Sequence, residues 1–244
     1  MINSGQRTAT ATGVMLSDPP GIGNALLDGG ESLFDPKFWA ARGALGDVSG
    51  GRGSAWFVGT EAEPWVLRHY RRGGFIARIS EDRYLWAGEG RVRAFAEWRL
   101  LAHLKQRGLP VPAPVAAWYR RDGLTYRCDL LTRRIARAMP LSASLRLQAL
   151  PASTWRAIGS AVARLHAAGA DHADLNAHNI LLDDQQTVTV IDFDRGQLRA
   201  PGAWSRGNLR RLHRSLAKLA AAMPPDRFTA ASWDCMLAGY RASG

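Results

Sequence analysis

Two acids and an amide between residues 172 and 195 have the types and the order that phosphoryl transfer requires. Asp174 stands five residues before Asn179, and a β-type run then leads directly into a second acid, Asp192. When a phosphoryl group is transferred from ATP, one acid accepts the proton of the attacking hydroxyl. An amide and another acid hold the Mg²⁺ ions that neutralise the phosphates. This segment therefore contains the set of groups that such chemistry needs.

The same segment matches two motifs of kinases. The catalytic loop of kinases has the form H-R-D-L-x-x-x-N and is followed later by D-F-G. The counterparts here are His172–Asn179 and Asp192–Asp194. Each polar residue taken singly could be a turn or strand-end residue that satisfies local backbone groups. Their occurrence together, on a loop–strand–strand–loop pattern, favours a phosphoryl-transfer site. We expect His172 to orient the loop through hydrogen bonds rather than to transfer protons.

The composition is that of a globular protein with a basic surface. The 244 residues are 46% hydrophobic and 22% charged, and the net charge is +11. Such a charge favours anionic partners: nucleic acid, acidic lipid headgroups or a phosphorylated substrate. The two cysteines lack metal-type spacing, which predicts reduced thiols and a cytosolic protein. The amino-terminal residues lack a secretory-signal pattern, and no apolar run approaches the ~20 residues needed to cross a bilayer. We therefore expect a soluble protein or one bound to a membrane surface.

A glycine-rich turn in the first half of the chain is a candidate for contact with phosphates. It occupies residues 46–54, between an expected short helix at 34–45 and a β-type run. Asp35 is the expected N-cap of that helix, with Pro36 at its first position. Backbone amides around Gly51 and Gly53 could lie against phosphate oxygens. Glycines also make plain hairpins, so this turn predicts phosphate binding only in combination with the acids described above.

Arg68 and Glu97 are candidates for a cation–carboxylate pair that grips the same phosphates. Arg68 lies in a β-rich run at 64–70, and Glu97 lies on an expected helix at 91–106. In ATP-dependent kinases a cation on the third strand contacts the phosphates and a helix glutamate holds that cation. The alternative for Glu97 is an exposed glutamate that pairs within its own helix.

The order of elements predicts an α+β fold, because a strand-rich half precedes a helix-rich half. Strands are expected at 115–119 and 124–131, and helices at 144–150, 153–168, 204–222 and 232–242. We predict a two-lobed fold, with an N-terminal antiparallel sheet that carries one main helix and a helical C-terminal lobe. The predicted divisions are an N-terminal arm (1–30), a nucleotide-binding N-lobe (31–132) and a catalytic and substrate-binding C-lobe (133–244).

Several longer strings carry a resemblance to a known family. They are Gly51–Ser54, Val66–Gly74, Gly108–Pro112, His172–Asp183, Ile191–Gly196 and Trp204–Lys218. Over roughly residues 30–220 the chain resembles proteins of the protein-kinase-like fold. More narrowly, it resembles the bacterial lipopolysaccharide-core kinases, among which the 3-deoxy-D-manno-octulosonic acid (Kdo) kinases match best.

The resemblance implies ATP- and Mg²⁺-dependent phosphorylation of the 4-hydroxyl of a Kdo residue on a lipid A precursor. This acceptor is an acidic glycolipid, and the enzyme would lie peripherally on the cytoplasmic face of the inner membrane. Carried over by position, Asp174 is the catalytic base, while Asn179 and Asp192 bind Mg²⁺.

The resemblance also implies that Arg68, held by Glu97, meets the nucleotide phosphates beneath the loop around Gly51 and Gly53. Arg68 stands where kinases usually have a lysine, so the need for a cation is met by a different side chain.

Other departures from the general kinase pattern concern regulation. Ala173 replaces the arginine that reads a phosphorylated activation loop, and only about ten residues separate Asp194 from the expected helix that begins at Trp204. So short a segment disfavours control by activation-loop phosphorylation. It also disfavours a protein substrate, which normally docks there.

Basic residues near the acids are candidates for contact with the acceptor. Helical spacing places Arg206, Arg210 and Arg214 on one face of the expected helix at 204–222. We predict that Arg195, Arg210 and Arg214 bind the acidic sugar, and that the basic surface also meets the anionic inner membrane. The alternative is an ordinary solvated basic helix.

Two other classes of function remain open on the sequence. The first is a heptose kinase or another small-molecule kinase of the same fold, such as an antibiotic phosphotransferase, because the ATP and metal motifs do not identify the acceptor. The second is a non-catalytic, basic, membrane-binding pseudokinase, which the retained acids and amide disfavour. No signature of a nucleic-acid-binding module supports a nucleic-acid partner.

Overall fold

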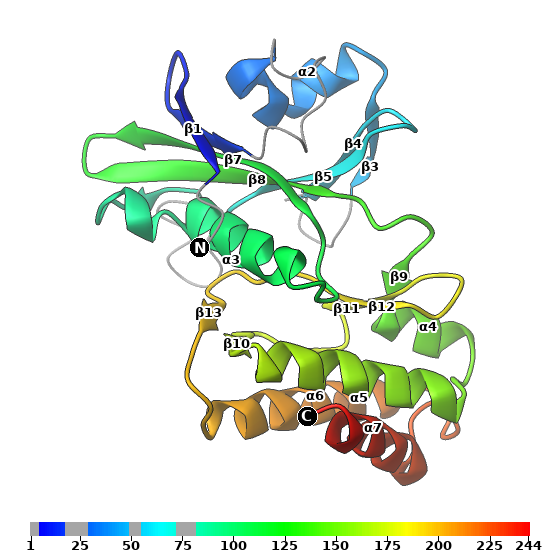
Figure 1. The fold of residues 1–244 in the computed structure, drawn as a ribbon. Coiled ribbons are helices and arrows are strands. Elements are labelled where there is room, and N and C mark those ends of the chain that lie inside the picture. The colour runs from blue at the N-terminus through cyan, green and yellow to red at the C-terminus, as the bar shows by residue number, and fades with distance from the viewer. Residues whose placement is uncertain (1–4, 18–28, 49–54, 72–81) are drawn as a thin grey trace. The chain divides into compact units, whose positions relative to one another are not determined.

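The computed structural model describes residues 5–17, 29–48, 55–71 and 82–244. The chain divides into two compact units. The first comprises Met1–His103 with Ala113–Arg134, and the second comprises Leu104–Pro112 with Ile135–Gly244. Each unit has its own secondary structure (Figure 1).

The first unit is built on an antiparallel sheet. Its described strands run in the order β1-β2-β7-β8-β5-β4-β3, and β6 pairs with β8. Strands β7 and β8 form a long central pair, from Pro114 opposite Thr132 to Asp122 opposite Thr125. Both strands contain β-branched and aromatic residues, which favour extended structure. The strands are β1 (Gln6–Ala9), β2 (Val14–Ser17), β3 (Leu45–Val48), β4 (Ala55–Gly59), β5 (Pro64–His69), β6 (Tyr84–Leu85), β7 (Pro114–Asp122) and β8 (Thr125–Arg133).

Helices cover both faces of this sheet (Figure 1). The 3-10 helix η2 (Gly30–Phe34) and helix α2 (Pro36–Ala40) pack on one face, and α3 (Arg93–Gln106), preceded by η4 (Glu89–Arg91), lies on the other. Successive residues of a strand point to opposite faces. On β5, Trp65 and Leu67 therefore enter the core under α2, while Arg68 faces α3.

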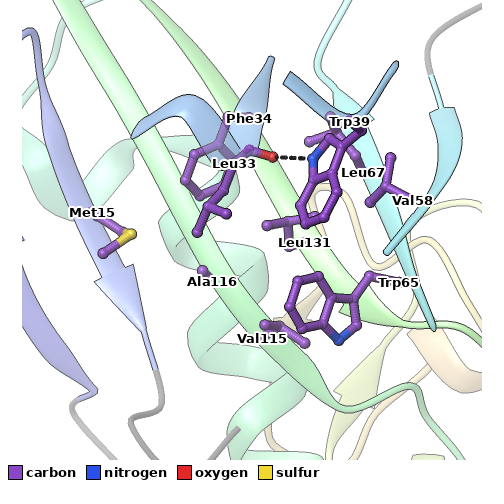
Figure 2. Packing of buried hydrophobic residues seen from close by; sticks show 10 residues of the cluster. All are labelled: Met15, Leu33, Phe34, Trp39, Val58, Trp65, Leu67, Val115, Ala116 and Leu131. Atoms are coloured by element: carbon purple, nitrogen blue, oxygen red, sulfur yellow. Dashed lines mark hydrogen bonds between the residues drawn. The ribbon is translucent and has the colours of Figure 1, made fainter. Parts of the chain in front are cut away.

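The core under α2 is dominated by tryptophan and aliphatic side chains (Figure 2). The rings of Trp39 and Trp65 meet edge to face with their centroids 5.7 Å apart. Trp39 Nε1 donates a hydrogen bond of 2.8 Å to the carbonyl oxygen of Leu33, which ties α2 to the preceding turn. This core packs against one face of β5, and β5 carries Arg68 on its other face.

Helix α2 begins as the sequence predicts but ends earlier. The Asp35 side chain caps it by accepting a hydrogen bond of 2.9 Å from the Lys37 amide, and Pro36 is its first residue. The predicted helix extended to Leu45, whereas α2 ends at Ala40. Gly43 adopts a left-handed conformation (φ 65°), which closes the helix and lets the chain enter β3.

Residues 5–17, expected in a loosely held arm with short strand pieces, form a hairpin that belongs to the sheet. Strand β1 pairs with β2, and β2 pairs with β7. Met15, Leu16 and Ser17 are buried. The apolar side chains of β2 therefore bind this part of the predicted arm to the first unit, although its composition is typical of a loop.

The second unit is mainly helical, as predicted. Its helices are α4 (Leu141–Leu147), α5 (Ala152–Ala167), α6 (Trp204–Ala220) and α7 (Ala230–Ala242). Short strands lie between them: β9 (Met139–Pro140), β10 (Ala170–Asp171), β11 (Ile180–Leu182), β12 (Val188–Val190) and β13 (Gln197–Leu198). Strands β12, β11 and β9 form one small antiparallel sheet, and β10 pairs with β13.

Together these elements confirm the predicted α+β fold class. Among the described residues, no helix has both the length and the apolar character that a membrane span requires.

Helices α5 and α7 pack at very close range because each has a glycine at the contact. A Cβ atom on Gly159 would lie 1.9 Å from the carbonyl oxygen of Met236, and one on Gly239 would lie 2.1 Å from that of Arg156. No side chain fits at either position unless the backbones move apart. This contact supports α5, the helix that leads into β10 and then into the loop that carries Asp174.

We expect Gly159→Ala to destabilise the protein by about 1–3 kcal/mol or more, because the added methyl group overpacks the α5–α7 contact. Each kcal/mol corresponds to a fall in Tm of roughly 2–4 °C for a domain of this size. Thermal unfolding followed by circular dichroism measures the effect. The matched control is Gly207→Ala in α6, where a Cβ atom meets nothing within 4 Å. That change should be neutral or stabilising, and equal losses in both variants would contradict the prediction.

Candidate active site

His172 holds the acid-bearing loop in place. The loop runs from His172 to Asn179 between β10 and β11. The buried His172 ring bonds the carbonyl oxygen of Ile191 through Nε2 (2.9 Å) and the amide of Asp174 through Nδ1 (3.1 Å). Because a carbonyl can only accept, Nε2 carries the proton and Nδ1 is the acceptor. Burial lowers the pKa of His172, which favours this neutral form. These bonds agree with the predicted orienting role.

Asp174 is fixed by two asparagines of the same loop. Asn176 Nδ2 donates to Oδ2 of Asp174 (3.0 Å) and to its carbonyl oxygen (3.1 Å). Asn179 Nδ2 donates to the same carbonyl oxygen (2.9 Å). The carboxylate is thus held by one oxygen, which leaves the other oriented for a further partner.

Asn179 and Asp192 are brought together through the backbone. The Ile191 amide donates a hydrogen bond of 2.9 Å to the carbonyl oxygen of Asn179, and Asp192 follows directly. Asp192 has a left-handed backbone conformation (φ 63°), which is uncommon for residues other than glycine but enriched for Asp and Asn. Since the Asn179 amide nitrogen is engaged with Asp174, its side-chain oxygen is available to a cation.

Helix α6 is tied to the same loop at two points. The buried Asn208 accepts a hydrogen bond from the His172 amide (3.1 Å) and donates one to Oδ1 of Asp171 (2.9 Å). Ser215, two turns further along, accepts from the Ala177 amide (3.2 Å). With Leu212 also buried, these contacts determine which face of α6 lies beside the loop.

Helix α4 is tied to the loop from another direction. The Ser142 amide donates to the carbonyl oxygen of Ala177 (3.1 Å), and the Ser142 hydroxyl bonds Nδ1 of His178 (2.9 Å). Arg146 lies one turn after Ser142 and therefore on the same side of α4.

A pocket of about 750 Å³ lies between the loop, α4 and α6. Asp174 contributes the one carboxylate among its described lining residues. Cationic side chains from both helices surround it, and the end of α6 with the turn that follows adds apolar groups. The lining residues are Arg146, Asp174, Asn176, His178, Arg211, Arg214, Ser215, Lys218, Leu219, Ala222 and Met223.

The pocket includes one of the three residues predicted to bind the acidic sugar. Arg214 lines it, whereas Arg195 and Arg210 are exposed and lie outside its lining. The sequence placed Arg206, Arg210 and Arg214 on one face of α6. The face that lines the pocket is instead that of Arg211, Arg214 and Lys218, because Asn208, Leu212 and Leu216 are the residues that pack inward.

In the first unit, Arg68 and Glu97 form the predicted pair. An Arg68 guanidinium nitrogen contacts Oε2 of Glu97, and the Glu97 side chain is only 3% exposed. The Tyr70 hydroxyl donates a second hydrogen bond of 2.5 Å to the same oxygen. The Arg68 guanidinium carbon also lies 4.5 Å from the centre of the Tyr70 ring. Burial raises the pKa of Tyr70 well above its usual range, so the hydroxyl keeps its proton and remains a donor. Gly51 and Gly53, the predicted phosphate-contacting glycines, lie outside the described residues.

Comparison with known proteins identifies the family. The model of the lipopolysaccharide kinase (Kdo/WaaP) family matches residues 36–240. The chain belongs to this family.

Relatives in this kinase family are similar over most of their length. A protein named 3-deoxy-D-manno-octulosonic acid kinase from Xanthomonas axonopodis pv. citri (strain 306) is 52% identical over 189 residues, which cover 77% of this chain and 75% of the relative. A protein of the same name from Stenotrophomonas maltophilia (strain R551-3) is 47% identical over 214 residues, which cover 87% and 84%. The predicted resemblance to lipopolysaccharide-core kinases is confirmed, and the protein is a phosphotransferase of the kinase type.

Tyr70 is a functional candidate in this kinase that the sequence did not single out. It lies two residues after Arg68, and so on the same face of the chain, but its partner Glu97 is 27 residues away. Only the alternation of strand residues pointed to it. Asn176 and Arg146 were missed for related reasons: the first occupies a variable position of the motif, and the second lies outside every motif.

We expect Tyr70→Phe to lower kcat/KM for ATP by roughly 10-fold, because a hydrogen bond to a buried charged group contributes about 1.5–3 kcal/mol. The substitution should change the kinetic constants for ATP and leave KM for the acceptor unchanged. Steady-state kinetics with each substrate varied in turn measures it. Tyr119→Phe is the matched control, since the Tyr119 hydroxyl donates to Glu89 (2.8 Å) in the same unit. Equal effects of the two variants on kcat/KM for ATP would contradict a specific role for Tyr70.

Proposed function

We propose that this protein is an ATP-dependent kinase that phosphorylates the 4-hydroxyl of a Kdo residue on a Kdo-lipid A precursor. The observation that carries the proposal is the pocket beside Asp174, where this residue is the one carboxylate among the described lining residues and cationic side chains surround it. An acidic sugar with a reactive hydroxyl fits such a pocket in both charge and chemistry. The names of its relatives, at 52% and 47% identity, support the same acceptor.

Asp174 is the catalytic base in this proposal. Its carboxylate accepts the proton of the attacking hydroxyl as the bond to phosphorus forms. The hydrogen bond from Asn176 to Oδ2 limits rotation of the carboxylate, so the other oxygen stays directed toward the acceptor. His172 and Asn179 fix the backbone of the same residue and so support its position.

Asn179 and Asp192 are the proposed Mg²⁺ ligands. Mg²⁺ prefers oxygen donors, and in kinase sites it is bound by one or two such side chains together with the phosphates of the substrate. The donor set fits, because Asn179 presents its amide oxygen and Asp192 a carboxylate on adjoining segments of backbone. When bound, the ion would neutralise charge on the phosphates of ATP.

Arg68 is the proposed contact for the nucleotide phosphates, positioned by Glu97 and Tyr70. A guanidinium group presents several donors in a planar fork, which suits phosphate oxygens as well as the usual lysine does. Gly51 and Gly53 remain proposed backbone contacts on the same phosphates.

We further propose that the protein works at the cytoplasmic face of the inner membrane, without spanning it. The net charge of +11 favours an anionic lipid surface, where each basic residue near the headgroups contributes about 1 kcal/mol. Arg195 and Arg210 are exposed, and they can meet either the acidic glycolipid or the surrounding headgroups.

Transfer of labelled γ-phosphate from ATP tests the function. The acceptors are a Kdo-lipid A precursor and the same lipid A precursor without Kdo, and nuclear magnetic resonance of the product locates the new phosphate. We expect label only on the Kdo-bearing acceptor, at the 4-hydroxyl. If the folded protein binds ATP but labels neither acceptor, the Kdo assignment is wrong. In that case a heptosylated lipid A precursor is offered as a third acceptor, and label on it would assign the protein as a heptose kinase.

A further inference from the structure

Arg146 reaches the pocket beside Asp174 from a different helix than the other cations do. It lies on α4, and the two hydrogen bonds of Ser142 to Ala177 and His178 hold that helix against the loop. Arg146 lies one turn beyond Ser142 and lines the pocket. Its place is therefore determined by the same loop that carries Asp174.

Three cations of α6 line the same pocket. Arg211, Arg214 and Lys218 follow one another at spacings of three and four residues, which places them along one face of the helix. The bonds of Asn208 and Ser215 to the loop hold this face toward the pocket.

The four cations have no protein partner in the part of the chain that the structure describes. Neither an ion pair nor a hydrogen bond joins the side chain of Arg146, Arg211, Arg214 or Lys218 to another described residue. Elsewhere in the second unit Arg199 pairs with Asp171, and Arg137 pairs with Asp184. Like charges that converge on one pocket repel each other, so the arrangement is favourable when an anion lies between them.

We propose that Arg146 is a specificity-determining residue: together with Arg211 and Arg214 it binds the carboxylate of the acceptor sugar and so selects a sugar acid over a neutral sugar. This inference rests on the proposed function and deepens it by naming the group that the pocket recognises. Guanidinium groups bind carboxylates through two parallel hydrogen bonds, which determines the orientation of the ligand as well as its affinity. A neutral sugar offers no such partner.

Orientation of the carboxylate matters for the reaction as well as for binding. Asp174 lines the same pocket, so a sugar held by its carboxylate presents a particular hydroxyl to the base. Arg146 thus acts as a positioning residue for the reacting hydroxyl, whereas Asp174 itself takes the proton.

The test compares wild type, Arg146→Gln and Arg146→Lys on two acceptors. One is the Kdo-lipid A precursor, and the other is the same molecule with its Kdo carboxylate converted to the methyl ester. We expect esterification to lower kcat/KM of the wild type by roughly 10- to 100-fold, the effect of losing a charge-assisted hydrogen bond. Arg146→Gln should show a similar loss on the natural acceptor and little further loss on the ester. On the natural acceptor, kcat/KM of Arg146→Lys should lie between the values of the wild type and Arg146→Gln. KM for ATP should be the same in all three proteins.

Arg241→Gln is the matched control for loss of one positive charge. Arg241 is exposed on α7 of the same unit and does not line the pocket. It should keep the full preference of the wild type for the acid. The proposal is overturned if Arg146→Gln keeps that preference too, or if it loses activity equally on both acceptors.

Equilibrium binding separates this proposal from the proposed function. If the wild type transfers phosphate to neither acceptor, the proposed function is wrong. Calorimetric titration with free Kdo and with its methyl ester then tests carboxylate recognition independently of the reaction. Tighter binding of the acid by the wild type, lost in Arg146→Gln, supports the proposal. Equal binding of acid and ester by the wild type refutes it.

Discussion

Replacing Asp174 by Asn should reduce the rate of phosphoryl transfer by roughly 10²- to 10⁴-fold, the usual contribution of a general base. The amide has nearly the same shape and can still bond Asn176, so the loop should keep its conformation. It cannot accept a proton from the acceptor hydroxyl. The loss should therefore lie in kcat, with affinities for ATP and the acceptor within about twofold of wild type.

Single-turnover transfer of labelled phosphate measures this prediction, and fluorescence titration with a nucleotide analogue measures the binding. Asp234→Asn is the control, because Asp234 is exposed on α7 and should tolerate the change at full rate. A variant of Asp174 that retains more than about a tenth of the wild-type rate would mean that another group takes the proton.

Replacing Asp192 by Asn should lower kcat/KM for ATP by roughly 10²-fold or more, since interactions of a metal ion with phosphate oxygens contribute several kcal/mol to transition-state stabilisation. Asn is the informative substitution because Asp192 has φ 63°. Asn adopts this left-handed conformation readily, whereas Ala would add a backbone penalty of about 1–2 kcal/mol. Asp192→Asn therefore removes the charge and keeps the backbone conformation, so its effect reports the loss of the charge alone.

Thermal stabilisation by nucleotide provides a second readout of this prediction. Mg-ATP should raise the Tm of the wild type, and that increase should fall sharply in Asp192→Asn and in wild type treated with EDTA. The variant without nucleotide should unfold near the wild-type temperature. Undiminished Mg²⁺-dependent stabilisation in Asp192→Asn would remove Asp192 from the proposed metal site.

Much of the architecture could be predicted from local patterns in the chain. The Asp35–Pro36 helix start and the expected helix at 91–106 indicated elements that the structure contains as α2 and α3. The α+β fold class followed from their order. Errors arose where a tertiary contact outweighed composition. Residues 5–17 were expected in a loosely held arm with short strand pieces, yet Met15 and Leu16 are buried in the sheet. Helix α2 ends at Ala40, five residues before the predicted end, because Gly43 turns the chain toward β3.

The sequence by itself determined that this protein has the groups for phosphoryl transfer. Those groups lie within one short loop and its neighbouring strand, so their spacing along the chain already constrains their spacing in space. The pairing of Arg68 with Glu97 was also predictable, because it requires only a strand followed by a helix.

Only the tertiary structure decided which cations meet at the pocket. Arg146 comes from a helix well before the loop and Arg211 from a helix well after it, and no local pattern relates them. The face of α6 that lines the pocket depends on the inward packing of Asn208 and Leu212, since a helix can turn any basic face outward until its buried contacts are formed. The residues proposed to recognise the acceptor are therefore brought together by tertiary packing, whereas the residues for phosphoryl transfer could be predicted from the sequence.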